Sequence, residues 1–333
     1  MGRAPDTTQD FGDLRVDVPE LRGYSDALDD CSRNLGSIEA RASASCNDAD
    51  FGKIVEDLTG DYATLLPQLK DLLAENESLM RDYALAVDKT AAEYVATDDG
   101  VSSRFKGDGI SAGQGTANYA VSSLVCLSPT PSEGELPEVS FGFLFDNLCW
   151  AIEKISGFDV RARVTDWIAG DVVGLSTQAN AWQIVGGSLE IVDGDVTEAT
   201  ARVNKTWDGN ASGTHAISMY LWSSALKEQA SGFRELGTAL DELAKEAVHV
   251  AQLVVDCIRL AVDLIASAWS LQYIPVYGQA KFIQKAWHAY KRVTKALAYL
   301  KMILSAVRAT KSLLVVMIDS FTPTMLPGKP LNV

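Results

Sequence analysis

Histidines are the first side chains to consider for acid–base or metal chemistry, and this chain has three of them: His215, His249 and His288. None belongs to an H-E-x-x-H zinc motif, and none is matched by a serine in a G-x-S-x-G nucleophile elbow. The carboxylates show no spacing that marks a general acid–base pair or a calcium loop. We therefore expect a protein that is not an enzyme, with no catalytic residue, no metal site and no cofactor.

The five cysteines are widely scattered, at Cys31, Cys46, Cys126, Cys149 and Cys257. They form no C-x-x-C pair and no Cys/His metal spacing, which favours buried free thiols. In an oxidising compartment, Cys31 with Cys46, or Cys126 with Cys149, are the alternative disulfide pairs.

Charge is distributed unevenly along the 333 residues, whose formal net charge is −15. Residues 270–333 hold nine Lys and Arg and one acid, Asp319, which gives +8, whereas the remainder has 20 basic and 43 acidic residues and carries −23. Because an acidic surface repels phosphates, we expect no nucleic-acid partner. The basic segment is suited to anionic lipid or to the acidic part of the chain itself.

Any site in this chain must be positioned by helices. Apolar residues recur at three- and four-residue intervals, as on one face of a helix, and they rarely alternate with polar residues as they would in a strand. The first two seams are Leu21, Tyr24, Leu28, Cys31, Leu35 and Ile38, and then Phe51, Ile54, Leu58, Tyr62, Leu65, Leu69, Leu72, Leu79 and Tyr83. The next two are Leu175, Ala179, Trp182, Val185, Leu189, Val192, Val196 and Val203, and then Ile217, Leu221, Leu226, Phe233, Leu236 and Leu240. They predict an all-α fold, an elongated bundle of two tandem antiparallel hairpins plus a hydrophobic C-terminal helical extension.

Between the third and fourth seams stand Trp207 and Gly209, separated by one residue. An indole can fill the gap at the end of a helical hairpin, and a glycine adopts backbone angles that other residues resist. This pair predicts the turn of the second hairpin, with Asn210 and Ser212 as candidate N-cap residues of the returning helix.

The first hairpin carries a second motif at its end. Tyr94 and Asp98 are four residues apart and so share a helical face, and the helix breaker Asp99-Gly100 follows them. Phe51-Gly52 stands where the first hairpin is expected to turn.

These residues resemble substrates of type VII (ESX) secretion systems. Residues 15–100, with Phe51-Gly52 and the Y-x-x-x-D pattern, resemble EspC-type substrates, and residues 140–310, with the W-x-G turn, resemble the WXG family and the related PPE-type module. The resemblance implies a non-enzymatic substrate or effector that presents Tyr94 and Asp98, as an export signal, to the secretion ATPase or a chaperone. In many family members the signal ends a short protein, whereas here it lies mid-chain.

The resemblance also implies a secreted or cell-envelope protein, exported without a Sec signal. The N-terminal residues MGRAPDTTQD accordingly contain no apolar stretch of the kind that a Sec signal requires. A homo-oligomer or a helical partner protein is a further expectation, and a cytosolic helical adaptor that never leaves the cell is an alternative function.

The patterns divide the chain into six expected segments. These are a disordered N-terminus (1–17), an EspC-like hairpin (18–98), a flexible Gly/Ser/Pro-rich linker (99–140), a WXG/PPE-like hairpin module (141–246), apolar and basic amphipathic helices (247–320) and a flexible tail (321–333). Within the first hairpin, Pro67 is expected to bend or break its helix, and Asn76 to fix the register of its seam.

Residues 247–318 suggest a second alternative, a membrane-active or pore-forming effector. A stripe of polar residues from His249 to Asp263 interrupts an otherwise apolar helix, which favours packing over spanning a membrane. The following amphipathic helix carries the candidate contacts to an anionic membrane: Lys281, Lys285, Lys291, Arg292 and Lys295 on one side, and Trp287 on the other. A solvated face packed on the bundle is the other interpretation of this helix.

Overall fold

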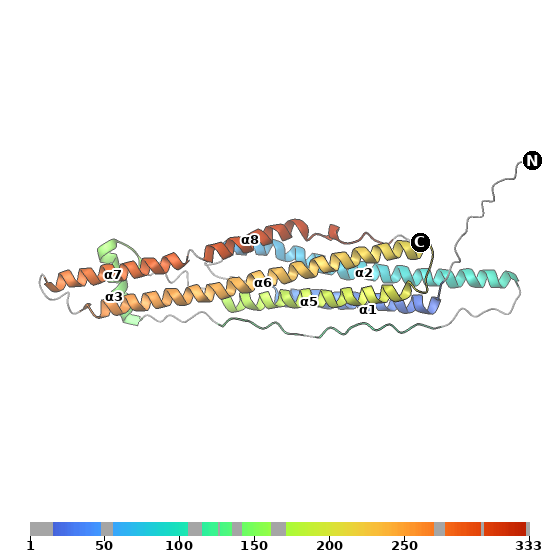
Figure 1. Cartoon of the computed structure of the whole chain (residues 1–333), viewed down its shortest axis with the longest axis horizontal. Helices are drawn as coiled ribbons and strands as arrows, with labels where there is room; N and C mark the ends of the chain where they lie inside the picture. Colours follow the sequence, from blue (N-terminus) through green and yellow to red (C-terminus); the bar gives the residue numbers. More distant parts are fainter. Residues whose placement is uncertain are drawn as a thin grey trace, which may run out of the picture.

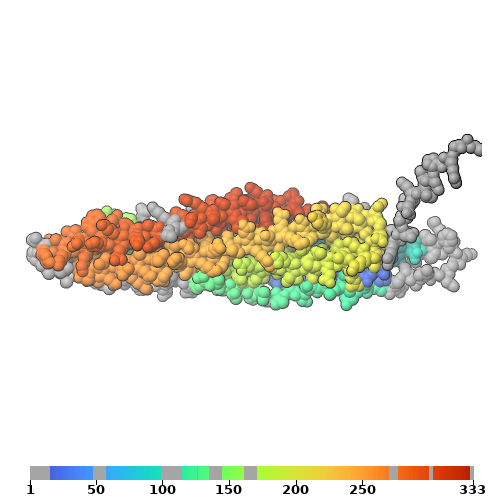
Figure 2. Space-filling view, in the orientation of Figure 1, coloured from blue at the N-terminus to red at the C-terminus, as the bar shows by residue number. Residues whose placement is uncertain are grey.

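The structure is a computed structural model that describes residues 16–47, 56–105, 115–125, 127–134, 142–160, 171–269, 277–300 and 303–330. Over these ranges the fold is all-α, as the sequence predicts, and it forms an elongated bundle (Figures 1 and 2). The β pairing in this part of the chain is limited to an isolated antiparallel bridge between Val16 and Trp207.

Two antiparallel hairpins form the body of the bundle. The first pairs α1 (Val18–Ser45) with α2 (Glu56–Phe105), and the second pairs α5 (Val172–Val203) with α6 (Asn210–Ala266). α1 also lies along α5, so the two hairpins share one hydrophobic core (Figure 1). The residues at which the first hairpin is expected to turn, Phe51 and Gly52, lie outside the described residues.

Local signals in the sequence begin these helices. The Asp17 carboxylate caps α1 by accepting a hydrogen bond from the Glu20 amide at 3.2 Å, and Pro19 occupies the first turn, where its missing N–H breaks no helical bond. α2 continues through Pro67 without a break. The buried leucines around that proline keep the helix on the core, and their packing outweighs the loss of one backbone hydrogen bond.

Every described residue of the first three predicted seams is buried, but the start of α6 departs from its predicted seam. Ile217 is 65% exposed and Leu221 is 47% exposed, whereas His215, Met219 and Trp222 face the core. The prediction was wrong for these two residues. The large indole of Trp222 takes the core side, and His215 finds a polar partner there, so the apolar Ile217 and Leu221 are rotated outward.

The gap between α2 and α6 is filled by the C-terminal part of the chain. α8 (Ile303–Ser320) contacts both helices. The next ten residues, 321–330, which we call the C-terminal strap, include the short 3-10 helix η2 (Pro323–Met325). The strap buries Phe321 and Leu326, and its Gly328 carbonyl accepts a hydrogen bond from the Tyr83 hydroxyl at 2.7 Å. The tail expected to be flexible is therefore packed on the bundle as far as Pro330.

α6 is one continuous helix of 57 residues that extends well beyond the paired hairpins. α7 (Tyr277–Leu300) and α3 (Gly142–Ser156) pack on its second half and on each other (Figure 1). The segment boundary expected between Glu246 and Ala247 falls inside α6, which continues through both residues without a break. The polar stripe from His249 to Asp263 faces solvent. Within the described ranges, no helix combines the length and the apolarity that a membrane crossing requires.

The expected linker also differs from a flexible connection. Its first residues continue α2 as far as Phe105, and residues 115–125 and 127–134 run extended along the bundle. The backbone amide and hydroxyl of Ser122 donate to the Asp195 carboxylate at 2.9 and 2.8 Å, and the amide of Thr130 donates to the Asn180 side chain at 3.0 Å. Polar side chains of α5 thus hold this segment in place. Such contacts leave no periodic pattern of apolar residues, so the sequence does not reveal them.

Candidate interaction site at the Trp207 turn

The chain reverses between α5 and α6 at a turn built around Trp207. The Trp207 amide donates to the Val203 carbonyl at 3.0 Å, and Gly209 has a φ of 114°, where a side chain would be strained. Gly209 itself stands at the N-cap of α6, without a side-chain capping bond. Neither Asn210 nor Ser212 is therefore the N-cap. The Ser212 hydroxyl instead donates to the Trp207 carbonyl at 2.7 Å and closes the turn.

The start of the chain's described part meets this turn. Val16 forms the isolated bridge with Trp207, and the Asp17 amide donates to the Thr206 carbonyl at 3.0 Å. The Trp207 side chain is only 3% exposed. Residues 16 and 17 thus contact the second hairpin, although both fall in the segment expected to be disordered.

Tyr94 brings the predicted export motif to the same turn. The Trp207 indole N–H donates to the Tyr94 hydroxyl, with 3.4 Å between Nε1 and Oη. Tyr94 is half-buried, and Asp98, one helical turn further along α2, is exposed. The two motifs that stand out in the sequence, 113 residues apart, therefore lie side by side at one end of the bundle.

His215 lies beneath this contact, in a neutral and largely aromatic environment. Its ring centroid is 5.4 Å from that of Trp207 and 5.4 Å from that of Tyr24. The Tyr24 hydroxyl is hydrogen bonded to His215 Nε2 at 2.8 Å and to the Thr200 hydroxyl at 2.9 Å. Burial lowers the pKa of His215 to about 4 and raises the pKa of Tyr24, so both side chains are uncharged at neutral pH.

The sequence patterns considered for His215 were catalytic ones, and they predicted no structural role for this residue. The usable signal was its spacing, because His215, Met219 and Trp222 follow one another at four and three residues, as a helical seam requires.

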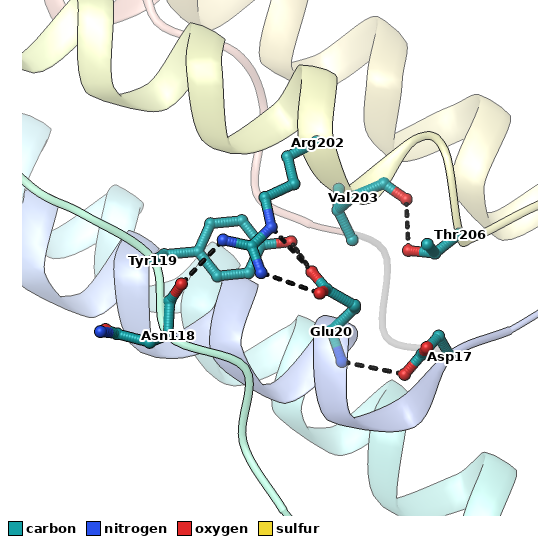
Figure 3. Close-up of polar contacts among 7 residues, drawn as sticks. All are labelled: Asp17, Glu20, Asn118, Tyr119, Arg202, Val203 and Thr206. Carbon is teal, nitrogen blue, oxygen red and sulfur yellow. Dashed lines mark hydrogen bonds and ion pairs between the residues drawn. The ribbon is translucent and has the colours of Figure 1, made fainter.

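A polar cluster fixes the elements that surround the turn (Figure 3). The Arg202 guanidinium donates to both carboxylate oxygens of Glu20, at 2.8 and 3.0 Å, and to the Asn118 carbonyl at 2.7 Å. It also lies over the ring of Tyr119, 4.0 Å from the centroid, and the Tyr119 hydroxyl donates to Glu20 at 2.9 Å. The hydrogen bond from Arg202 holds the pKa of Glu20 below its usual value. One arginine thereby ties together the end of α5, the start of α1 and the extended segment.

A cavity of about 390 Å³ opens beside the turn, between α2 and α6. Its walls include Tyr83, Val87, Trp207 and His215, and Pro330 of the C-terminal strap lies at its edge. It is the stretch of the α2–α6 gap that α8 and residues 321–330 leave open. The residues that line it carry no charge at neutral pH, which suits apolar or aromatic groups.

The side chains around the turn contact one another through ring packing and neutral hydrogen bonds. Among the described residues, no group of three or more His, Cys, Asp or Glu side chains is placed to hold a metal ion. Burial raises the pKa of the free thiols of Cys31 and Cys46 to about 12, so neither is a thiolate nucleophile at neutral pH. Comparison of the chain with protein-family models, with curated proteins and with solved structures finds no match.

The candidate lipid contacts lie far from this site, on α7 at the opposite end of the bundle (Figure 1). Lys281, Trp287, Lys291, Arg292 and Lys295 are exposed. The remaining candidate, Lys285, is half-buried, and its ammonium donates to the Ser267 hydroxyl at 2.8 Å.

Proposed function

We propose that this chain is a non-enzymatic substrate of a type VII (ESX) secretion system. In this proposal Tyr94, Asp98 and the Trp207 turn form one export epitope, which the secretion ATPase or a chaperone binds. The observation that carries the proposal is the contact between the Trp207 indole nitrogen and the Tyr94 hydroxyl. The Y-x-x-x-D and W-x-G patterns come from different hairpins, and this contact joins them.

The shared core of the two hairpins supports this proposal. α1 lies along α5, and the Glu20–Arg202 pair joins the same two helices, so the position of Tyr94 relative to Trp207 is fixed within one molecule. A tether raises the effective concentration of one hairpin near the other. The epitope therefore forms without a separate partner chain.

The different exposure of the two signal residues suggests a division of roles. Tyr94 is half-buried against the indole, so its ring is held in one orientation. Asp98 is exposed on the next turn of α2, where a basic side chain of the ATPase has access to it. Tyr94 then supplies shape and Asp98 supplies charge.

The test is secretion by the producing cells, with the culture filtrate compared with the cell lysate. Tyr94→Ala and Asp98→Asn are the test variants. Tyr220→Ala, at a tyrosine that is 75% exposed on α6, and Asp88→Asn, at an exposed acid on α2, are the matched controls. We expect the two test variants to stay in the lysate while wild type and both controls reach the filtrate. Circular dichroism of each purified variant excludes misfolding as the cause of retention.

Two outcomes would overturn the proposal. Retention of wild type in the lysate would contradict export and would favour the cytosolic adaptor. Export of wild type together with both test variants would show that Tyr94 and Asp98 are not the signal. A Tyr94→Phe variant separates the ring from the hydroxyl, because it keeps the packing against Trp207 and removes only the acceptor at 3.4 Å.

A further inference from the structure

α7 differs in charge from the rest of the chain. It contains five Lys and Arg residues and no acidic residue, whereas the chain as a whole has a formal net charge of −15. It lies at the end of the bundle opposite the Trp207 turn, so its charge is separated from the proposed export epitope (Figures 1 and 2).

One face of α7 is used for packing, and the other is free. Ala286, Ala289, Val293 and Ala296 are fully buried and allow the helix to lie close to its neighbours α3 and α6. Lys281, Lys291, Arg292 and Lys295 are exposed. Within the part of the chain that the structure describes, none of these four cations forms an ion pair. Their charge is therefore available to an external anion.

Exposed apolar side chains flank this basic face. Ile283 is 49% exposed and Trp287 is 45% exposed, and because they are four residues apart they share one side of the helix. Lys291 follows Trp287 by another four residues and extends the same line. Tyr277 is 65% exposed at the start of the helix, and the Lys281 ammonium lies 4.5 Å from the centroid of its ring. The apolar pair thus adjoins the cations on one exposed side of the helix.

We propose that this face of α7 docks on an anionic lipid surface, with Ile283 and Trp287 entering the lipid interface and the four cations contacting the headgroups. A bilayer accepts both components, since tryptophan favours the membrane interface and each basic side chain is attracted to anionic lipid. An acidic protein surface would pair with the cations but would leave Ile283 and Trp287 without an apolar environment. The bilayer therefore accounts for more of this surface.

The charge of the remaining chain sets the orientation of docking. Outside residues 270–333 the chain has 20 basic and 43 acidic residues, so an anionic surface repels it. We expect the molecule to attach through its α7 end and to keep the Trp207 end away from the lipid. This inference goes beyond the export proposal and does not depend on it.

Flotation of the full chain with lipid vesicles tests the inference. One set contains phosphatidylcholine alone, and the other contains phosphatidylcholine mixed with phosphatidylglycerol. The charge variant is Lys281→Gln/Lys291→Gln/Lys295→Gln, and its control is Lys89→Gln/Lys205→Gln/Lys227→Gln, which removes three exposed lysines from the other half of the bundle. We expect binding to the mixed vesicles only, and a loss of affinity of about tenfold or more for the charge variant alone.

The Trp287→Ala variant separates a lipid surface from an acidic partner. We expect it to weaken binding to mixed vesicles without changing binding to soluble polyglutamate, which offers charge but no apolar phase. Absence of wild-type binding to mixed vesicles would overturn the inference, and so would equal binding of the charge variant and its control. Binding to polyglutamate with none to mixed vesicles would also overturn it, in favour of an acidic protein partner. Circular dichroism verifies that each variant is folded.

Discussion

Asn76 of α2 and Gln229 of α6 exchange two amide hydrogen bonds in the middle of the hydrophobic core. Asn76 donates to Gln229 at 2.6 Å, Gln229 donates back at 3.1 Å, and both side chains are fully buried. The two amides satisfy each other only when these helices hold one relative register. A slip of either helix would leave two buried amides without partners, so the pair selects the observed alignment.

The first prediction concerns this pair. Asn76→Leu should lower the free energy of unfolding by about 1–3 kcal/mol, because it leaves the Gln229 amide buried and unpaired. The double variant Asn76→Leu/Gln229→Leu should recover most of this loss, since neither polar group then remains. Urea unfolding followed by circular dichroism measures the stability of the wild type, of each single variant and of the double variant. Strictly additive destabilisation would contradict the coupling of the two residues.

The second prediction is a pH dependence that arises from His215. Its pKa is about 4 in the folded chain and 6.5 in the reference state, so the unfolded chain binds more protons between these values. Stability should therefore fall as the pH falls, by about 2 kcal/mol for this residue between pH 7 and pH 5. Urea unfolding at both pH values measures the change.

Two variants assign this pH dependence to one residue. His215→Gln should remove that part of it, because glutamine does not titrate. His249→Gln, at a histidine whose side chain is 66% exposed, is the control for the substitution itself. An unchanged pH slope in His215→Gln would contradict the assignment.

The third prediction compares two glycines of α6. A Cβ at Gly232 would lie 2.1 Å from Cζ of Phe321, whereas a Cβ at Gly213 would meet no atom within 4 Å. Gly232→Ala should displace the Phe321 ring, lower the free energy of unfolding by about 1–3 kcal/mol and speed amide exchange in residues 321–330. Gly213→Ala should raise it by up to about 1 kcal/mol, because alanine favours the helix. Equal stabilities would mean that Phe321 does not occupy this place.

The fourth prediction concerns the polar cluster of Figure 3. Arg202→Lys keeps the charge but loses the two-point contact with Glu20 and the planar group over Tyr119. Because both charged side chains are partly exposed, at 42% and 21%, water screens the pair and the loss of stability should be small. Its main effect should be faster amide exchange in residues 115–125. Arg234→Lys, in the more exposed pair with Glu190, is the control and should leave that exchange unaltered.

The seams of α1, α2 and α5 could be predicted because burial of one helical face imposes a period on the sequence. Tyr24, Trp182 and Val192 are all fully buried, as their spacing predicts. The position of Asn76 in its seam likewise predicted a register-fixing role, although its partner could not be named before the packing of α2 against α6 was known. Periodicity identifies the buried face of a helix, and the partner comes only from the tertiary fold.

Other features left no such period. The extended segment is held by hydrogen bonds such as Ser122 to Asp195, and polar residues with the same composition are common in flexible linkers. The strap is anchored by three buried side chains, Phe321, Leu326 and Pro327, too few to define a pattern. In the candidate site, Trp207 and Tyr94 stood out by type and spacing. Their contact depends on how two hairpins that are distant in the sequence pack together, and the residues around each motif do not encode that packing.

The continuous helix α6 determines how far apart the two ends of the molecule act. At about 1.5 Å per residue, its 57 residues span about 85 Å, and they run from the Trp207 turn to the region where α7 packs. The two ends of the molecule are therefore separated by most of the length of this helix. Under the two proposals, this helix would separate the lipid-bound end from the export epitope by a length that its residue count sets.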